Sequence, residues 1–291
     1  MTKGLKIVVL AKQVPDTRNV GKDAMKEDGT VNRAALPAIF NPEDLHALEL
    51  ALRLKDQNRG TTVHLLTMGP GRAADIIREG LFRGADGGVL LTDRKFAGAD
   101  TLATSYAISR AVEKLAPDLI VAGRQAIDGD TAQVGPQVAE KLGLPQITCA
   151  EKVVSLENST LTVVRRLEHG VETVSGKLPL LVTVNSSAPA CRPRNAKQTM
   201  RYKHSKTLGE LQAQAGDDVY SNAANARLTI TEWGVADIDG DENQFGLKGS
   251  PTKVKKIENV VFQTKESKTL SDADADIEGF VKELIANHNI G

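Results

Sequence analysis

The sequence predicts a doubly wound α/β protein, with a mostly parallel sheet and helices on both of its faces. Short apolar runs alternate with stretches of helical periodicity, and five such alternations occur by about residue 150. The apolar runs are continuous, which is typical of parallel strands that are covered on both sides.

The first half of the chain supplies the elements of this sheet. Buried strands are predicted at Lys6–Ala11, Val63–Met68, Val89–Leu91 and Leu119–Ala122. The first helix has a clear start signal, because Asn41 is a favourable N-cap and Pro42 takes the first helical position. Leu45, Leu48 and Leu52 then fall on one face of that helix. Further helices are predicted over Arg72–Arg83, Thr101–Leu115 and Ala132–Leu142.

The pattern changes over Lys152–Val184. Short strands alternate there with turns at Glu157–Ser159, His169–Gly170 and Gly176–Lys177. We therefore expect an antiparallel meander of four strands that is appended to the parallel sheet. A loop rich in small residues and proline, Ser186–Arg194, follows it.

The last third of the chain differs from both. Residues 201–250 are polar and weakly patterned, which indicates an extended arm rather than a core. A helix is expected over Asp274–Asn287, and its apolar stripe consists of Ile277, Phe280, Val281, Leu284 and Ile285. That stripe must be buried on the chain's own domain or on another chain. We divide the chain into an α/β domain over residues 1–200 and an arm over residues 201–291, whose terminal helix is expected to dock on a partner.

Composition argues against several classes of function. Lys and Arg total 37, as do Asp and Glu, so the formal net charge is zero. Nucleic acid and anionic membranes select basic surfaces, so neither is expected as the main partner. The apolar run near the N-terminus is too short for a signal-peptide core or a bilayer span, which predicts a cytoplasmic protein without membrane insertion. Cys149 and Cys191 are expected to be reduced thiols.

The segment Asp118–Pro136 carries the clearest candidate for a ligand site. A predicted strand ends at Gly123, a polar loop follows, and a helix is expected to begin at Thr131. In doubly wound sheets, ligands bind at the carboxyl ends of strands near the point where the strand order reverses. A helix N-terminus there offers N–H groups to a phosphate, and Gly129 allows the backbone to approach closely.

The charged side chains of this loop fit a phosphate unevenly. Arg124 could add a positive charge, whereas Asp128 and Asp130 would repel a phosphate and are expected to cap the loop or to bind ribose hydroxyls. A structural alternative, in which the aspartates only cap a turn, stays open. Two other loops, Lys12–Asp16 and Met68–Arg72, end neighbouring strands and are weak signals alone.

Several catalytic and phosphate-binding signatures are absent from the sequence. It contains no G-x-x-x-x-G-K-[ST] loop, no G-x-G-x-x-G, no H-E-x-x-H and no C-x-x-C. The five histidines are scattered, and no Ser-His-Asp or Cys-His set is indicated. The sequence therefore favours a binding or redox role over hydrolysis, with no predicted catalytic residue and no predicted metal ligand.

Five short motifs occur in a fixed order along the chain. They are Lys12–Asp16 (KQVPD), Asn41–Glu49 (NPEDLHALE), Met68–Pro70 (MGP), Phe96–Ser105 (FAGADTLATS) and Gly123–Val134 (GRQAIDGDTAQV). Together they resemble the β subunit of electron-transfer flavoproteins over roughly residues 5–185, and Gly246–Thr252 (GLKGSPT) extends the likeness. Each motif alone is weak, whereas the ordered set is specific.

The resemblance implies a fold, ligands and partners. Members of this family have an adenine-nucleotide-hydrolase-like α/β fold and pair with an α subunit that holds FAD. In plain members the β subunit binds AMP as a structural ligand, whereas in electron-bifurcating members it holds a second FAD that takes a hydride from NADH. The sequence resembles the bifurcating group at Asp128–Pro136 and Gly246–Thr252. FAD, with NADH as the electron donor, is therefore the expectation and AMP the alternative.

The resemblance also implies which residues contact the nucleotide half of the ligand. They are Leu10, Ala11, Asn41, Pro42, Glu43, Asp44, Met68, Gly69, Gly123, Arg124, Gln125, Ala126, Ile127, Asp128, Gly129, Asp130, Thr131, Ala132, Gln133 and Val134. Within this set, the N–H groups of Asp130–Gln133 would cradle the phosphate.

The loop Ser186–Arg194 corresponds to the one with which the family recognises its dehydrogenase partner, such as an acyl-CoA dehydrogenase. Ala190–Pro193 (ACRP) departs from the usual family sequence there, so the identity of that partner stays open. Two hypotheses from different classes remain. The chain is either a redox subunit that binds FAD and receives electrons from NADH, or an interaction protein that binds AMP and a partner without passing electrons itself.

Overall fold

The computed structural model describes residues 4–16, 37–214, 229–252 and 269–287. Its backbone divides into two compact units, Met1–Val254 and Lys255–Gly291, which are considered separately. None of the helices in the described ranges is both long enough and apolar enough to cross a membrane.

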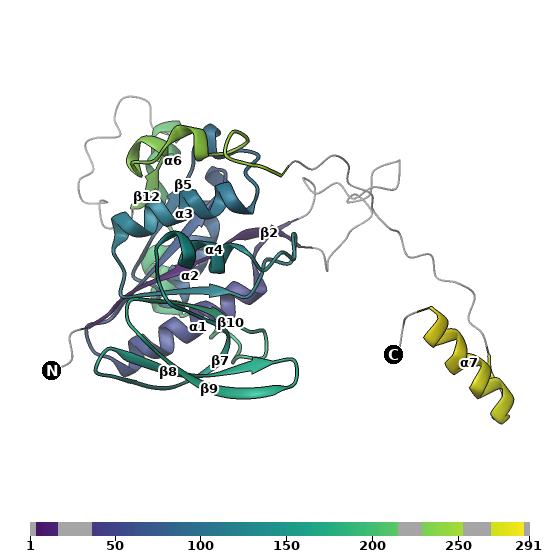
Figure 1. The fold of residues 1–291 in the computed structure, drawn as a ribbon. Coiled ribbons are helices and arrows are strands. Elements are labelled where there is room, and N and C mark those ends of the chain that lie inside the picture. Colours follow the sequence, from purple (N-terminus) through teal and green to yellow (C-terminus); the bar gives the residue numbers. More distant parts are fainter. Residues whose placement is uncertain (1–3, 17–36, 215–228, 253–268, 288–291) are drawn as a thin grey trace. The chain divides into compact units, whose positions relative to one another are not determined.

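The first unit is built around a ten-stranded sheet with the order β11-β12-β5-β4-β1-β6-β10-β7-β8-β9 (Figure 1). Its central strands are β5 (Gly87–Leu91), β4 (Thr62–Met68), β1 (Lys6–Leu10), β6 (Leu119–Gly123) and β10 (Leu180–Val184). All neighbours among them pair in parallel. The chain adds β4 and β5 on one side of β1 and then returns to place β6 on the other side. The strand order therefore reverses between β1 and β6, which confirms the doubly wound fold class.

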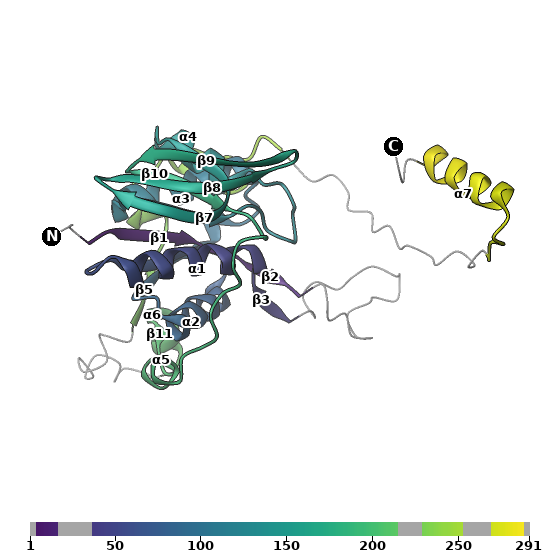
Figure 2. The same cartoon turned by 90° about the horizontal axis from the view of Figure 1, so that it is seen from below.

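Helices cover both faces of this sheet (Figure 2). One face carries α1 (Pro42–Gln57) and α2 (Ala74–Arg83), and the other carries α3 (Thr101–Leu115) and α4 (Val134–Lys141). Along β1, Ile7 and Val9 belong to the core under α1 and α2. Val8 and Leu10 belong to the core under α3 and α4. Successive side chains of a strand point to opposite faces, so a strand between two helical layers must be apolar throughout.

The expected four-stranded meander is only partly right. The strands β7 (Gln146–Glu157), β8 (Thr160–Leu167) and β9 (Gly170–Lys177) do pair antiparallel. The fourth strand, β10, instead lies between β6 and β7 and pairs in parallel with both. All five residues of β10 are buried, whereas β9 is mostly exposed at the edge of the sheet. A strand that is apolar on both faces needs an interior position, and this accounts for the difference.

Residues after 200 add further strands to the other edge. The elements are α5 (Ala196–Tyr202), β11 (Lys206–Thr207), α6 (Leu208–Gln214) and β12 (Thr229–Trp233). The strand β12 pairs in parallel with β5, and Ile230, Val235 and Phe245 are buried. Two short 3₁₀ turns, Val235–Asp237 and Glu242–Gln244, follow. The described part of residues 201–250 thus extends the sheet, where an extended arm was expected.

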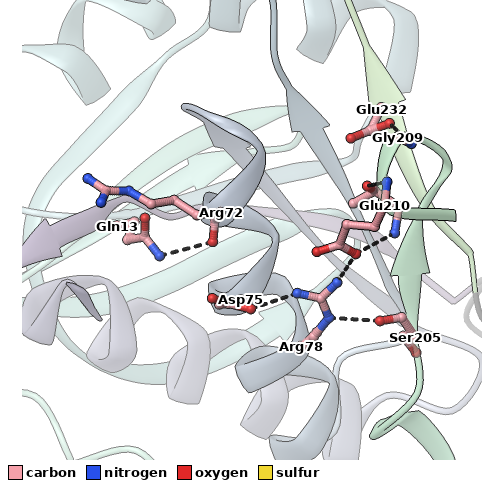
Figure 3. Close-up of polar contacts among 9 residues, drawn as sticks. Gln13, Arg72, Asp75, Arg78, Ser205, Gly209, Glu210 and Glu232 are labelled. Carbon is pink, nitrogen blue, oxygen red and sulfur yellow. Dashed lines mark hydrogen bonds and ion pairs between the residues drawn. The ribbon is translucent and has the colours of Figure 1, made fainter. Parts of the chain in front are cut away.

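Arg78 of α2 forms polar contacts that connect the elements after residue 200 to α2 (Figure 3). Its guanidinium donates to the carbonyl oxygen of Ser205 at 2.7 Å, and it forms ion pairs with Glu210 and, at 2.6 Å, with Asp75. The Arg78 side chain is only 15% exposed, so these contacts also satisfy a largely buried cation.

The second unit contributes one described helix, α7 (Asp274–Ala286), close to the predicted bounds. Within this unit, Ile277, Phe280, Val281 and Ile285 of the apolar stripe are exposed, and Leu284 is half-buried. The predicted helix is confirmed, and its docking on a partner stays a prediction.

Candidate functional site

The candidate site lies at the carboxyl edge of three neighbouring strands, β4, β1 and β6. Leu10 ends β1, Met68 ends β4, and Gly123 ends β6, so the structure brings these predicted residues to one edge. Ala11 continues from β1 and donates its N–H to the Leu66 carbonyl oxygen at 3.0 Å. The reversal of strand order between β1 and β6 makes this edge the expected ligand position of a doubly wound sheet.

Asp44, in the first turn of α1, joins the loops that follow β1 and β6. Its Oδ2 accepts a hydrogen bond from the N–H of Lys12 at 2.8 Å, and its Oδ1 accepts one from the N–H of Gly123 at 3.2 Å. Burial raises the pKa of this carboxyl to about 7, although hydrogen bonds from Lys12, Asn41 and Gly123 act in the opposite direction.

Asn41 and Glu43 hold the loop after β6. Asn41 is the residue before α1, but its side chain makes no capping bond. Its Nδ2 donates to the Gln125 carbonyl oxygen at 2.9 Å, and its Oδ1 accepts from the Ile127 N–H at 3.2 Å. Glu43 accepts from the Gln125 N–H at 3.0 Å and pairs with Arg124 at 3.2 Å. Arg124 is thus paired with Glu43, and its expected contribution of a positive charge to a phosphate site stays a prediction.

Gly123 has a steric role between β6 and α1. A Cβ at this position would lie 2.4 Å from Oδ1 of Asp44 and 2.7 Å from the carbonyl carbon of Glu43. Because backbone atoms cannot move away as a flexible side chain can, only glycine fits here. The start of α1 and the end of β6 thus form one tightly packed unit.

The loop between β6 and α4 is open by comparison. The helix begins at Val134 and not at Thr131 as predicted, since Asp130 and Ala132 adopt positive φ values of 48° and 52°. Within the described ranges, the backbone N–H groups of Thr131, Ala132 and Gln133 donate to no protein acceptor. No heavy atom lies within 4 Å of the place where a Cβ of Gly129 would stand. Such a row of free donors beside an open glycine suits a phosphate.

The two aspartates of this loop are engaged by the protein itself. Asp128 pairs with Lys12 at 2.8 Å, and Oδ1 of Asp130 accepts from Nε2 of Gln125 at 3.0 Å. The first contact ties the loop after β6 to the loop after β1, and the second closes a turn. These contacts agree with the expected capping role, whereas binding of ribose hydroxyls stays a prediction.

Thr101, the first residue of α3, also contacts this loop, although sequence reasoning did not count it as a site residue. Its Oγ1 donates to Oε1 of Gln133 at 2.8 Å. The preceding Asp100 accepts hydrogen bonds from the N–H and the Oγ1 of Thr252, at 3.1 and 2.6 Å. Two sequence motifs, Phe96–Ser105 and Gly246–Thr252, thereby adjoin the loop before α4. In the sequence, the one indication that these two segments belong to the site was that both are among the family motifs.

The loop Ser186–Arg194 is fixed by ion pairs to α1. Arg192 binds Glu49 and Asp56, each at 2.9 Å. Cys191 beside it is a free, half-buried thiol whose pKa is raised to about 11 by burial. A thiol in that state is unreactive at neutral pH, which favours a packing role for it.

Comparison with known proteins agrees with these features. The family model described as electron transfer flavoprotein domain matches residues 28–207. The chain is 46% identical over 252 residues to electron transfer flavoprotein subunit beta of Clostridium acetobutylicum, with 87% of each chain covered. It is 43% identical over 260 residues to the protein of the same name from Megasphaera elsdenii, again with 87% of each covered.

A third relative is named as a subunit of a larger complex. The caffeyl-CoA reductase-Etf complex subunit CarD of Acetobacterium woodii is 41% identical over 251 residues, with 86% of each chain covered. The match of the family model and these similarities, which cover 86–87% of each chain, agree with the ordered motifs and with the doubly wound sheet. This chain therefore belongs to the electron transfer flavoprotein family.

Proposed function

We propose that this chain is a redox subunit that binds FAD at the loops following β1 and β6. An electron-transfer role is what its family supports, and the ligand and the electron path are the proposal. The chemistry that bound FAD would provide is acceptance of a hydride from NADH. The electrons would then pass to a second FAD on an α subunit and on to a flavin-dependent dehydrogenase, as in flavin-based electron bifurcation.

The observation that carries the proposal is the row of N–H groups over residues 131–133 that have no acceptor in the described part of the chain, beside the open position at Gly129. Free backbone N–H donors stabilise a bound anion without a lysine or arginine. Their place next to the reversal between β1 and β6 is where doubly wound sheets bind nucleotides. A nucleotide phosphate is therefore the ligand group that best fits this loop.

The chain's own residues would serve to position the ligand. Hydride transfer needs the donor and acceptor rings in contact and requires no acid, base or metal from the protein. Asn41, Glu43 and Asp44 hold the backbone of the loop after β6, and Thr101 holds Gln133. These contacts fix the loop that would bind the phosphate before any ligand arrives.

The choice of FAD over AMP rests on likeness. The segments Asp128–Pro136 and Gly246–Thr252 resemble the bifurcating group, and one relative is named as an Etf complex subunit. AMP as a structural ligand would use the same loop, and in that case the chain would support electron transfer without receiving electrons from NADH.

Flavin counting separates these two functions. The complex is purified, its flavins are counted, and NADH is added without oxygen. We expect two FAD per heterodimer and bleaching of the flavin absorption by NADH. One flavin with one AMP per heterodimer, or no bleaching, would overturn the proposal and leave the AMP-binding function.

An α-subunit partner is part of the proposal. The motive is the exposed stripe of α7, made of Ile277, Phe280, Val281 and Ile285. Covering these side chains stabilises an assembly by on the order of several kcal/mol. Deletion of residues 270–291 should weaken co-purification with the α subunit, and unchanged complex formation would count against this docking. A cytoplasmic location stays a prediction from the sequence.

A further inference from the structure

Asp44 occupies an unusual position for a residue expected to touch a ligand. It is 7% exposed, and both carboxylate oxygens accept hydrogen bonds from backbone N–H groups of the protein. Those donors, Lys12 and Gly123, lie in the loops that follow β1 and β6. Asp44 therefore bridges the two loops between which the strand order reverses.

The packing around Asp44 leaves little freedom. The Cβ position of Gly123 is within 2.4 Å of Oδ1 of Asp44, so the end of β6 is pressed against the carboxylate. The fully buried side chain of Asn41 forms hydrogen bonds with the backbone of Gln125 and Ile127, two and four residues after Gly123 in the same loop. A change at Asp44 would therefore be transmitted to the backbone that leads to the open N–H groups before α4.

We infer that Asp44 is a positioning residue, whose carboxylate sets the spacing between the loops after β1 and β6 and thereby the affinity of the nucleotide site. This inference rests on the proposed function, because it assumes that a nucleotide phosphate binds the loop before α4. In this role Asp44 acts through the two loops that its carboxylate bridges.

The charge of Asp44 determines how well it bridges the loops. An ionised carboxylate accepts on both oxygens, whereas a protonated one carries a hydroxyl that meets an N–H donor and loses one of the two bonds. Burial raises the pKa of Asp44 to about 7, and the neighbouring Glu43 acts in the same direction. The other charged groups at this place are paired elsewhere: Arg124 with Glu43, and the ammonium of Lys12 with Asp128. Asp44 thus changes charge near neutral pH.

The test uses the full-length chain in its complex, depleted of bound nucleotide, with AMP as the probe because AMP is common to both candidate ligands. AMP affinity is measured calorimetrically between pH 6 and 8.5 for wild type, Asp44→Asn and Asp44→Ser. Both variants lack the carboxylate charge, and serine is smaller than asparagine. If one variant fails to fold, the other can still be compared with wild type. The loss of one hydrogen bond to a charged acceptor predicts about tenfold weaker binding at pH 8.5.

The pH profile separates positioning from a general structural defect. Wild-type affinity should fall towards the value of the variants as the pH drops through 7. The variants should show only the pH dependence of AMP itself, so the difference between the profiles isolates Asp44. Equal or tighter binding by both variants, or a difference that does not change with pH, would overturn the inference.

Gly129→Val distinguishes failure of the inference from failure of the proposed function. Its Cβ position is open, so the fold should persist while the approach of a phosphate is blocked. If Gly129→Val binds AMP like wild type, the site lies elsewhere and both proposals fall. If Gly129→Val loses AMP while both Asp44 variants match wild type at every pH, the inference on Asp44 alone falls.

Discussion

Two helices begin at the same edge of the sheet, and their N-termini are used in opposite ways. In the first turn of α1, the buried side chains of Glu43 and Asp44 accept hydrogen bonds from neighbouring loops. Before α4, the N–H groups over residues 131–133 find no acceptor among the described residues, and Gln133 makes no side-chain cap. The difference shows that a good helix start does not by itself mark a ligand site. The acidic side chains at the start of α1 already hold neighbouring loops, whereas the loop before α4 still offers backbone donors to a ligand.

The largest expected effect comes from Gly123→Ala at the end of β6, and Gly129→Ala in the following loop serves for comparison. Gly123→Ala would press a methyl group onto Asp44 and onto the backbone of Glu43, at 2.4 and 2.7 Å. Overpacking of this kind lowers the free energy of unfolding by about 1–3 kcal/mol. The measurement is urea-induced unfolding of both the variant and the wild type.

Gly129→Ala is the matched control. No atom lies within 4 Å of the added methyl group, so a change within about 0.5 kcal/mol is expected. Equal destabilisation by the two substitutions would contradict the contrast between a packed and an open helix start.

The pH dependence of stability should reveal the buried carboxyl at the start of α1. Asp44 has a folded-state pKa of about 7 against an ordinary value of 3.8, so the folded chain binds a proton that the unfolded chain has lost. Its contribution to stability is therefore fully present below about pH 4 and is lost as the pH rises towards 7, by up to about 1.4 kcal/mol per pH unit. Asp44→Asn should remove this slope. Parallel stability curves of variant and wild type between pH 4 and 7 would refute the assignment.

The smallest effect is expected where the two loops meet at the surface. Lys12 and Asp128 form an ion pair at 2.8 Å, but the Lys12 side chain is 48% exposed. Exposed pairs contribute little because water and salt screen them. Lys12→Met should change the free energy of unfolding by less than about 0.5 kcal/mol, as measured by urea titration. A loss above 1 kcal/mol would mean that the pair braces the loops as Asp44 does.

Local patterns in the sequence predicted much of the fold. The predicted helix Thr101–Leu115 has the bounds that the structure shows, and the side chain of Asp100 caps its start. The strands β1, β4, β5 and β6 followed from continuous apolar runs. The pairing of β10 could not be predicted in the same way, because position within a sheet depends on contacts with distant strands.

The candidate site shows the same limit. The loop before α4 was recognised from its glycines and its position after a buried strand. The bridging role of Asp44 was not recognised, because its partners Lys12 and Gly123 lie 32 and 79 residues away in the sequence. In addition, acidic residues in a first helical turn normally face water. Nothing in a local pattern indicates that such a side chain will be buried.

The central claim, that the loop before α4 binds a nucleotide phosphate, is tested most directly by amide hydrogen exchange with and without AMP. The N–H groups of Thr131, Ala132 and Gln133 have no acceptor in the ranges that the structure describes, whereas those of Gly123 and Gln125 are already bonded to Asp44 and Glu43. Saturating AMP should slow exchange at residues 131–133 and leave residues 123 and 125 nearly unchanged. Bound AMP that leaves exchange at residues 131–133 unaltered would contradict the central claim.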